Sequence, residues 1–303
     1  MSILVVGSVA LDSVQTPFGE VEDALGGAAV YFSAAASFYD RVNLVGVVGE
    51  DFPIHYLGFL QDRNVDLAGL QVLPGKTFRW KGRYDYNLNA RDTLDTQLNV
   101  FADFHPQIPE AFRDSTYVFL ANIHPQLQLE VLQQMRAPRL TAMDTMNYWI
   151  ESEREALTRV ISAVDIIIIN EEEARQLADT YNLVRAAGAI LDLGPRAVVI
   201  KRGEYGATLF YRGDQPIDFF FAPAYPLEEL KDPTGAGDTF AGGFMGYLAK
   251  EDDASDAAIR RAMIHGSVLA SHAVEDFSLG RLRDLTWEDI EARYQIFRRC
   301  TLF

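Results

Sequence analysis

The chain has 303 residues, of which 49% are hydrophobic, and its formal net charge is −16. This composition indicates a folded globular protein with a large core. The acidic balance excludes nucleic acid and anionic membranes as expected partners, because both repel a negative surface. The single cysteine, Cys300, excludes an internal disulfide framework. The sequence starts in an apolar strand with no targeting leader, and no apolar run is long enough for a membrane span, so we expect a cytoplasmic protein.

Apolar, β-branched runs alternate with helical patterns along the chain, which is typical of a parallel sheet with helices on both faces. The predicted strands are Ile3–Val9, Val42–Val48, Tyr117–Ala121, Leu140–Met143, Asp165–Ile169 and Ala197–Ile200. The predicted helices are Ala28–Phe38, Ile54–Arg63, Gln126–Met135, Glu151–Ala163, Glu171–Ala178, Thr239–Ala249, Ala257–Ala273 and Trp287–Arg298. We expect residues 1–303 to form a single α/β domain.

Two segments, about 13–25 and 76–101, break this alternation. The second has alternating aromatic and polar residues around a turn, which predicts antiparallel ribbons outside the main sheet. Together the two segments could form a lid that excludes water from a site at the edge of the sheet. A contact between two copies of the chain is an alternative use of the same surface, and the two uses are compatible.

The strongest candidate for a catalytic motif is the stretch from Asp232 to Phe244. It reads Asp-Pro-Thr-Gly-Ala-Gly-Asp-Thr-Phe-Ala-Gly-Gly-Phe. It places the carboxylate of Asp238 directly after Gly235-Ala236-Gly237, where a helix is predicted to begin. Unpaired N–H groups at a helix start hold anions, and glycines let a charged group approach the backbone. This arrangement suits a reaction in which a hydroxyl loses its proton to a carboxylate while negative charge develops nearby. A simple N-cap role for Asp238 is the alternative.

The sequence contains no complete example of the other nucleotide-binding and metal-binding motifs considered. Pro74-Gly75-Lys76-Thr77 has the ending of a P-loop, but Leu70 stands where the first glycine is required. Phe240 stands where a dinucleotide fingerprint requires its third glycine. The five histidines have no metal-ligand spacing, and structural roles are favoured for them.

Further polar and glycine residues follow predicted strands, where open α/β sheets bind their ligands. They are Asp12, Gly26-Gly27, Asn170 to Glu173, and the turn Lys201-Arg-Gly203-Glu-Tyr-Gly206. Each has a structural alternative as a cap, a turn or a solvated helix start. Their joint occurrence at strand ends favours a binding site.

With these motifs in this order, the sequence resembles the ribokinase (PfkB) family of carbohydrate and nucleoside kinases. The resemblance covers nearly the whole chain, and its most specific element is Asp232-Pro-Thr-Gly-Ala-Gly-Asp238. It implies a ribokinase-like three-layer α/β/α sandwich with a mostly parallel central sheet and a small β-sheet lid. The implied activity is transfer of the ATP γ-phosphate to a hydroxyl of a small sugar or polyol.

The resemblance also implies roles for individual residues. Asp238 is the expected general base, and Gly235, Ala236 and Gly237 form the expected anion hole. Asp12, Gly26, Gly27 and Asn122 are expected to contact the acceptor. Asn170, Lys201, Gly203, Gly206 and Ser267 are expected on the nucleotide side. Glu173 is expected to hold Mg²⁺ through water, and Asp232 and Thr234 match a loop that binds a monovalent cation such as K⁺ in many members.

The sequence leaves the identity of the acceptor molecule open. Ala10, Ala28 and Tyr31 stand where ribokinase-like sugar kinases carry polar sugar contacts, which puts ribose itself in doubt. Phe18, Phe78 and Trp80 of the lid could stack on a base, which favours a nucleoside kinase of the same family, although packing of lid on sheet is the commoner role. Asp144 and Asn147 are further polar candidates near the site. A non-catalytic sugar- or nucleotide-binding protein on this scaffold is the alternative from another class, and the intact Asp238 motif argues against it.

Overall fold

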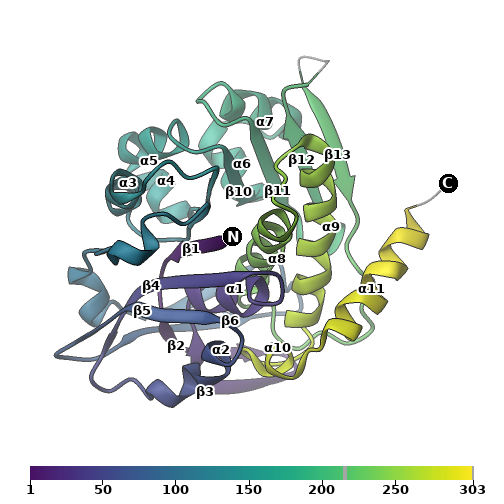
Figure 1. Ribbon diagram of the computed structural model, residues 1–303. Helices are drawn as coiled ribbons and strands as arrows, with labels where there is room; N and C mark the ends of the chain where they lie inside the picture. Colours follow the sequence, from purple (N-terminus) through teal and green to yellow (C-terminus); the bar gives the residue numbers. More distant parts are fainter. Residues whose placement is uncertain (214–216, 302–303) are drawn as a thin grey trace.

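The structure is a computed structural model that describes residues 1–213 and 217–301. Helices pack on both faces of a large sheet, and a smaller separate sheet lies at the lower end of the view in Figure 1. The predicted three-layer α/β/α sandwich with a mostly parallel sheet and a small second sheet is therefore confirmed. None of the helices in the described part of the chain has the length and apolar composition that crossing a bilayer requires.

The large sheet has the strand order β13-β12-β11-β10-β9-β8-β1-β4-β5. Its strands are β1 (Ser2–Val6), β4 (Arg41–Gly49), β5 (Val65–Leu73), β8 (Tyr117–Leu120), β9 (Leu140–Met143), β10 (Ile166–Asn170), β11 (Ala197–Lys201), β12 (Ala207–Tyr211) and β13 (Asp218–Ala222). All pairs are parallel except β11–β12 and β12–β13. The strand order reverses at β1, and open α/β sheets bind ligands beside such a reversal.

Two apolar cores lie on the two faces of this sheet. Ile3 and Val5 point into one core, while Leu4 and Val6 point into the other. The first core is covered by α1 (Ala28–Ala36), α2 (Gly58–Gln61), α8 (Ala236–Glu251), α9 (Asp256–Ala273), α10 (Gly280–Asp284) and α11 (Trp287–Cys300). The second is covered by α3 (Pro125–Gln134), α4 (Asn147–Ser152), α5 (Arg154–Ile161), α6 (Glu171–Ala178) and α7 (Leu183–Leu191).

Small residues bring α8 close to its neighbours. A Cβ on Gly242 would lie 2.3 Å from the Phe32 carbonyl oxygen of α1, and one on Gly243 would lie 2.9 Å from the His265 carbonyl oxygen of α9. Because neither position has room for a side chain, the glycines of α8 fix its depth between α1 and α9. This packing places the N-terminus of α8, with the Gly235–Asp238 motif, at the edge of the sheet.

The small sheet has the order β3-β2-β6-β7, with strands β2 (Ala10–Thr16), β3 (Gly19–Gly26), β6 (Phe78–Tyr84) and β7 (Arg91–Gln97). Two antiparallel hairpins, β2–β3 and β6–β7, join through a parallel β2–β6 pair. The predicted first strand, Ile3–Val9, was too long, because β1 ends at Val6. Hydropathy could not reveal that break, since Val9, Ala10 and Leu11 are as buried as β1 itself. Asp12 therefore belongs to the small sheet.

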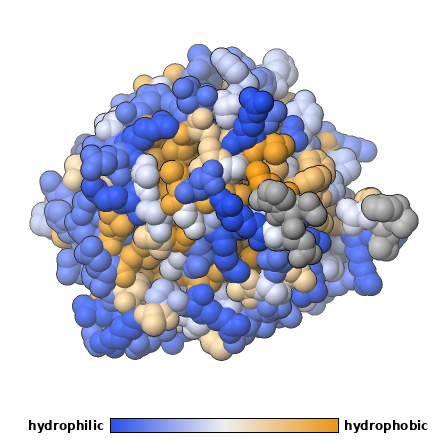
Figure 2. Space-filling model, turned by 90° about the horizontal axis from the view of Figure 1, so that it is seen from above, coloured by the Kyte–Doolittle hydropathy of each residue, from blue (hydrophilic) through white to orange (hydrophobic). Residues whose placement is uncertain are grey.

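Other differences are local. The predicted helix Ile54–Arg63 is a 3₁₀ turn, Ile54–Leu57, followed by α2, and the predicted helix Glu151–Ala163 is divided between α4 and α5 at Glu153. Strands β5, β12 and β13 and helix α7 were not predicted. Strand β13 lies at the sheet edge, with Phe219 and Phe221 exposed, so its pattern does not resemble a buried strand. On the face seen in Figure 2, hydrophilic residues predominate and apolar residues gather in patches toward the middle.

Candidate active site

Three neighbouring parallel strands end beside one another at the site. Asp144 follows β9, Asn170 ends β10 and Lys201 ends β11. Asn170 and Lys201 are paired neighbours in the β10–β11 register. The sequence expectation that these strand ends meet at one edge is therefore supported by the sheet order.

Asn170 and Glu173 form a capping box at the start of α6. The Asn170 side chain accepts the Glu173 N–H, and the Glu173 carboxylate accepts the Asn170 N–H, both at 2.8 Å. The structural alternative for Asn170, a helix cap, is thus correct. The cap also orients Glu173, which is only 7% exposed, at the end of β10.

Helix α8 begins at Ala236, three residues before the predicted start at Thr239. Its N-cap is Gly235, whose φ of 74° lies in the left-handed region that favours glycine. Asp238 therefore lies in the first turn of α8, and its alternative role as N-cap is wrong. The Ala236 N–H already donates to the Pro233 carbonyl oxygen at 3.2 Å, so an anion at this helix start would compete with that bond.

Two side chains crowd the backbone of the glycine motif. A Cβ on Gly235 would lie 2.4 Å from the Tyr31 ring, and a Cβ on Gly237 would lie 2.8 Å from the Lys201 Nζ. The ammonium group of Lys201 is therefore held against the positive end of α8. A cation beside helix N–H groups makes the region suited to an anion with more than one charge.

Carboxyl groups gather around this anion region. Burial is the main cause that raises the pKa of Asp144, Glu173 and Asp238. The charge of Lys201 lowers the pKa of all three groups, while Asp238 further raises that of Asp144. A raised pKa brings the base closer to the range in which a carboxylate accepts protons well.

Asp12 lies beside the glycine pair Gly26-Gly27. A Cβ on Gly26 would lie 1.9 Å from the Asp12 Oδ2, so only glycine leaves room for this carboxylate. Burial raises the pKa of Asp12 to about 7, with smaller raising effects from Asp232 and Asp238, while the Gly27 N–H lowers it. The structure thus brings the three predicted acceptor contacts Asp12, Gly26 and Gly27 together, near the expected base.

The inner face of the small sheet covers Asp12. Trp80 is the register neighbour of Asp12 on β6, and its ring lies across Gly82, where a Cβ would be 2.0 Å from the ring. The Tyr84 hydroxyl lies 3.3 Å from the Thr234 hydroxyl, so the lid contacts the glycine motif directly.

Of the three lid aromatics considered for base stacking, only Trp80 is beside Asp12. Phe78 stacks on Phe101, with ring centroids 5.1 Å apart. Phe18 is 52% exposed and makes an edge contact with Tyr86. The contact between lids of two copies stays a prediction.

Asp232 is almost fully buried, and both of its carboxylate oxygens accept backbone hydrogen bonds. Oδ1 accepts the Thr234 N–H at 2.9 Å, and Oδ2 accepts the Ser278 N–H at 3.2 Å. The Val274 carbonyl oxygen in turn accepts the N–H groups of Lys231 and Asp232. These contacts fix the conformation of the loop, and the monovalent-cation role of Asp232 and Thr234 stays a prediction.

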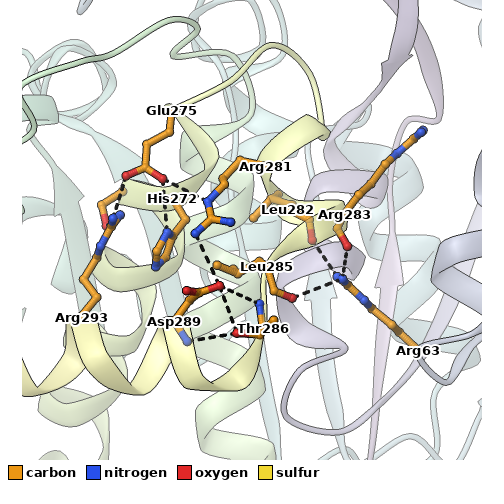
Figure 3. Close-up of polar contacts among 11 residues, drawn as sticks. Arg63, His272, Glu275, Arg281, Leu282, Arg283, Leu285, Thr286, Asp289 and Arg293 are labelled. Atoms are coloured by element: carbon orange, nitrogen blue, oxygen red, sulfur yellow. Dashed lines mark hydrogen bonds and ion pairs between the residues drawn. The ribbon is translucent and has the colours of Figure 1, made fainter.

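Figure 3 shows the hydrogen bonds and ion pairs that hold the segment carrying Val274 and Ser278 against the C-terminal helices. Glu275 accepts from Arg293 at 2.7 Å and from Arg281 at 3.3 Å, which ties the end of α9 to α10 and α11. His272 lies 3.4 Å from the same carboxylate. Arg63 donates to the carbonyl oxygens of Leu282, Arg283 and Leu285. The C-terminal helices therefore hold the loop beside Asp232.

The remaining predicted site residues lie in different surroundings, some in contact with the lid and others within the fold. Gly203, with a φ of 55°, is in contact with Asn89 of the lid, and Gly206 packs on the Ala222 carbonyl oxygen. Ser267 is buried within α9. Asn122 accepts the Trp149 indole N–H at 2.9 Å and donates to the Met146 sulfur, so both ends of its amide are occupied. The roles of Ser267 and Asn122 stay predictions.

The residues present fit Mg²⁺ if substrate phosphates complete its coordination. The Asp144 Oδ1 is buried and has no hydrogen-bond partner in the described part of the chain. Asp144 and Glu173 supply carboxylates at adjacent strand ends. Within residues 1–213 and 217–301, no group of three or more His, Cys, Asp or Glu side chains could hold a metal. Mg²⁺ is commonly bound through one or two carboxylates together with phosphates and water.

Arg91 and Tyr84 were not predicted as site residues. Arg91 is paired opposite Tyr84 across the β6–β7 hairpin, and its charge lowers the pKa of Asp12, Glu173 and Asp238. The alternation of side chains along β6 places Trp80 and Tyr84 on one face. It could not show which residue of β7 faces the site, because the hairpin contains a register shift.

Comparison with known proteins gives one family. The model of the pfkB family of carbohydrate kinases matches residues 2–280. A cytidine kinase of Thermococcus kodakarensis is 33% identical over 253 residues, which cover 82% of this chain and 88% of that protein. The structure of a Burkholderia thailandensis nucleoside kinase in complex with inosine has a TM-score of 0.74 at 20% identity, covering 97% of this chain and 98% of that one. A putative ribokinase II from E. coli in complex with ATP and Mg²⁺ has a TM-score of 0.75 at 18% identity, with 99% of each chain covered.

Proposed function

The chain belongs to the pfkB family of carbohydrate kinases, and on this basis we propose that it transfers the γ-phosphate of ATP to a hydroxyl of a nucleoside. Members of the family are phosphotransferases with a sugar or nucleoside hydroxyl as acceptor, and this chain is one of them.

Asp238 is the general base in this proposal. It lies in the first turn of α8, next to the amides of Gly237 and to Lys201. The acceptor hydroxyl gives its proton to Asp238 while its oxygen forms a bond to the γ-phosphorus and the bond from that phosphorus to ADP breaks. The Gly235–Gly237 amides and Lys201 stabilise the negative charge on the transferring group.

Asn170, Lys201, Gly203 and Gly206 bind the nucleotide phosphates from the ends of β10 and β11 in this proposal. Asp144 and Glu173 would hold Mg²⁺, Glu173 through water, and the bound ion would neutralise phosphate charge. The buried, partnerless Oδ1 of Asp144 supports this role, because a buried carboxylate oxygen without a partner is costly unless a ligand satisfies it.

The observation that carries the nucleoside assignment is Trp80 beside Asp12. The Trp80 ring packs against Gly82 beside the carboxylate expected to bind the acceptor, and an indole ring can stack on a base. The 33% identity to a cytidine kinase supports the same acceptor class. So does the presence of Ala10 and Tyr31 where sugar kinases carry polar contacts.

A sugar or polyol acceptor, which the sequence alone favoured, is the second candidate. An inositol 3-kinase of Arabidopsis thaliana is 22% identical over 280 residues, covering 89% of this chain and 74% of that protein. Such an acceptor would bind to Asp12, but it has no base that could stack on the Trp80 ring.

An ADP-release assay over cytidine, uridine, adenosine, inosine, ribose, fructose and myo-inositol separates the candidates. We expect a nucleoside to have the highest kcat/KM, and Asp238→Asn to lower its kcat by about 10²- to 10⁴-fold. Trp80→Leu should raise the KM of the nucleoside about tenfold, whereas Phe78→Leu, which alters packing away from Asp12, should leave it nearly unchanged. A best substrate without a base would establish the second candidate. No turnover of any acceptor would favour a binding protein without catalysis.

A further inference from the structure

The β6–β7 hairpin of the lid contacts the site at two separate points. Near the base of the hairpin loop, the Tyr84 hydroxyl lies 3.3 Å from the Thr234 hydroxyl, beside the Gly235–Asp238 motif. At its tip, Asn89 lies so close to Gly203 that a Cβ on that glycine would be 1.8 Å from the Asn89 Oδ1. One contact is with Thr234 of the glycine motif, and the other is with the expected nucleotide turn. The hairpin therefore spans the gap between the two halves of the site.

Arg91 lies between these two contacts. It is paired with Tyr84 in the β6–β7 register and is two residues after Asn89. Its guanidinium carbon is 5.7 Å from the centroid of the Trp80 ring. Since Trp80 is the register neighbour of Asp12, Arg91 lies on the inner face of the lid, above the acceptor side of the site.

The charges around Arg91 come from several elements. Its guanidinium lowers the pKa of Asp12 on β2, of Glu173 on α6 and of Asp238 on α8. The charge of this one cation therefore acts on carboxylates from three elements. Lys201 acts on Glu173 and Asp238 from the end of β11, on the sheet side. The two cations therefore act on Glu173 and Asp238 from the lid and from the sheet.

We propose that Arg91 is a further catalytic residue, a guanidinium delivered by the lid that contacts the transferring phosphoryl group. The proposal rests on the proposed function. Asp12, Glu173 and Asp238 surround the reacting groups with negative charge, which repels a triphosphate. Lys201 and the amides of α8 oppose that repulsion from one side only. A planar guanidinium on the other side binds two phosphate oxygens at once and stabilises the charge that spreads over them during transfer.

Arg91 exchanges no proton and forms no covalent bond in this step. The hydroxyl proton goes to Asp238, and ADP leaves with the electrons of the broken bond. Arg91 is part of β7, so its guanidinium reaches the phosphoryl group only when the lid contacts Thr234 and Gly203. Positive charge then lies on both sides of that group. This requirement couples catalysis to exclusion of water, the competing acceptor.

The test compares Arg91→Gln with Arg83→Gln. Arg83 belongs to the same hairpin but forms an exposed ion pair with Asp92 at 3.0 Å, next to the buried Tyr84. We expect Arg91→Gln to lower kcat about 10²- to 10³-fold with the acceptor KM within about threefold, and Arg83→Gln to stay near the wild-type values. Methylguanidinium should restore part of the activity of Arg91→Ala. A kcat of Arg91→Gln within about threefold of wild type, or equal losses in both variants, would overturn the proposal.

Calorimetric binding of ATP and ADP without acceptor gives an independent measurement. Arg91→Gln should weaken ATP binding more than ADP binding, since only ATP has the γ-phosphate, and Arg83→Gln should weaken neither. An ATP-to-ADP affinity ratio unchanged by Arg91→Gln contradicts the proposal. This result does not depend on which acceptor is phosphorylated, so an incorrect acceptor and an incorrect role for Arg91 give different outcomes.

Discussion

The ammonium group of Lys201 lies against the backbone of Gly237, where a Cβ would be only 2.8 Å from Nζ. Lys201 ends β11, and Gly237 is in the first turn of α8, so this contact joins two elements that are 36 residues apart in the sequence. It places a cation beside helix N–H groups and next to the carboxylate of Asp238. The anion-binding character of the motif therefore depends on the size of residue 237.

Gly237→Ala should lower kcat while preserving the fold. The methyl group would displace the Lys201 amine from the start of α8, and we expect a loss of about tenfold or more. Gly58→Ala is the matched control, because a Cβ on Gly58 has no heavy atom within 4 Å. Steady-state kinetics and thermal melts of both variants make the comparison. Equal activity of the two variants would show that the Lys201 contact has no part in catalysis.

The rate should fall on acidification with a midpoint above the ordinary aspartate value of 3.8. Burial raises the pKa of Asp238, and the base must be deprotonated to accept the hydroxyl proton, so activity is lost as pH falls through that raised pKa. Lys201 lowers the same pKa, so Lys201→Met should move the acid limb of kcat to higher pH. Lys250→Met, at the other end of α8, should leave the limb in place. A shift to lower pH in Lys201→Met would contradict this electrostatic account.

The sheet and the glycine motif could be predicted because each has a local sequence pattern that is typical of one structure. Apolar runs such as Ile166–Ile169 are readable as buried strands, and Gly235–Asp238 has few alternative uses. The edge at which Asp144, Asn170 and Lys201 meet follows from parallel pairing alone. Helix start and cap assignments were less certain, since Asp238 proved to be inside α8 and Asn170 proved to be a cap.

The lid side of the site was harder to predict. Asp12 was assigned to the end of the first strand, because burial continues from β1 into β2 without a polar break. Arg91 lies in a strand whose residues are all exposed, so no hydrophobic pattern marks the face that it shares with Tyr84. Contacts such as Asn89 with Gly203 join residues more than a hundred positions apart, and they depend on how the lid closes.

Asp12→Asn should stabilise the protein at pH 8 more than at pH 5. Burial raises the pKa of Asp12 in the folded protein to about 7 from 3.8. Between these values the folded state keeps a proton that the unfolded state releases, so the stability contributed by this group is lost as pH rises through about 7. The penalty reaches at most about 4 kcal/mol above that pH.

The measurement is the difference in Tm between Asp12→Asn and wild type at the two pH values. We expect the difference to grow by a few degrees from pH 5 to pH 8, together with a large loss of acceptor turnover. Asp103→Asn, at an exposed position, serves as the control. A Tm difference that is independent of pH would mean that Asp12 titrates normally.

Activity should be nearly independent of K⁺, although the family resemblance implies a monovalent-cation loop at Asp232 and Thr234. Both oxygens of Asp232 already accept N–H groups, from Thr234 at 2.9 Å and from Ser278 at 3.2 Å. The Val274 carbonyl oxygen accepts the Lys231 N–H at 2.9 Å, and the Lys231 ammonium group lies 3.1 Å from Asp276. A cation could bind here only by sharing oxygens that already accept N–H groups, in a loop that Glu275 and Arg293 hold in place. Replacing K⁺ with tetramethylammonium at constant ionic strength should therefore change kcat by less than about twofold. Activation by K⁺ of tenfold or more, absent in Asp232→Asn, would instead assign a cation to this loop.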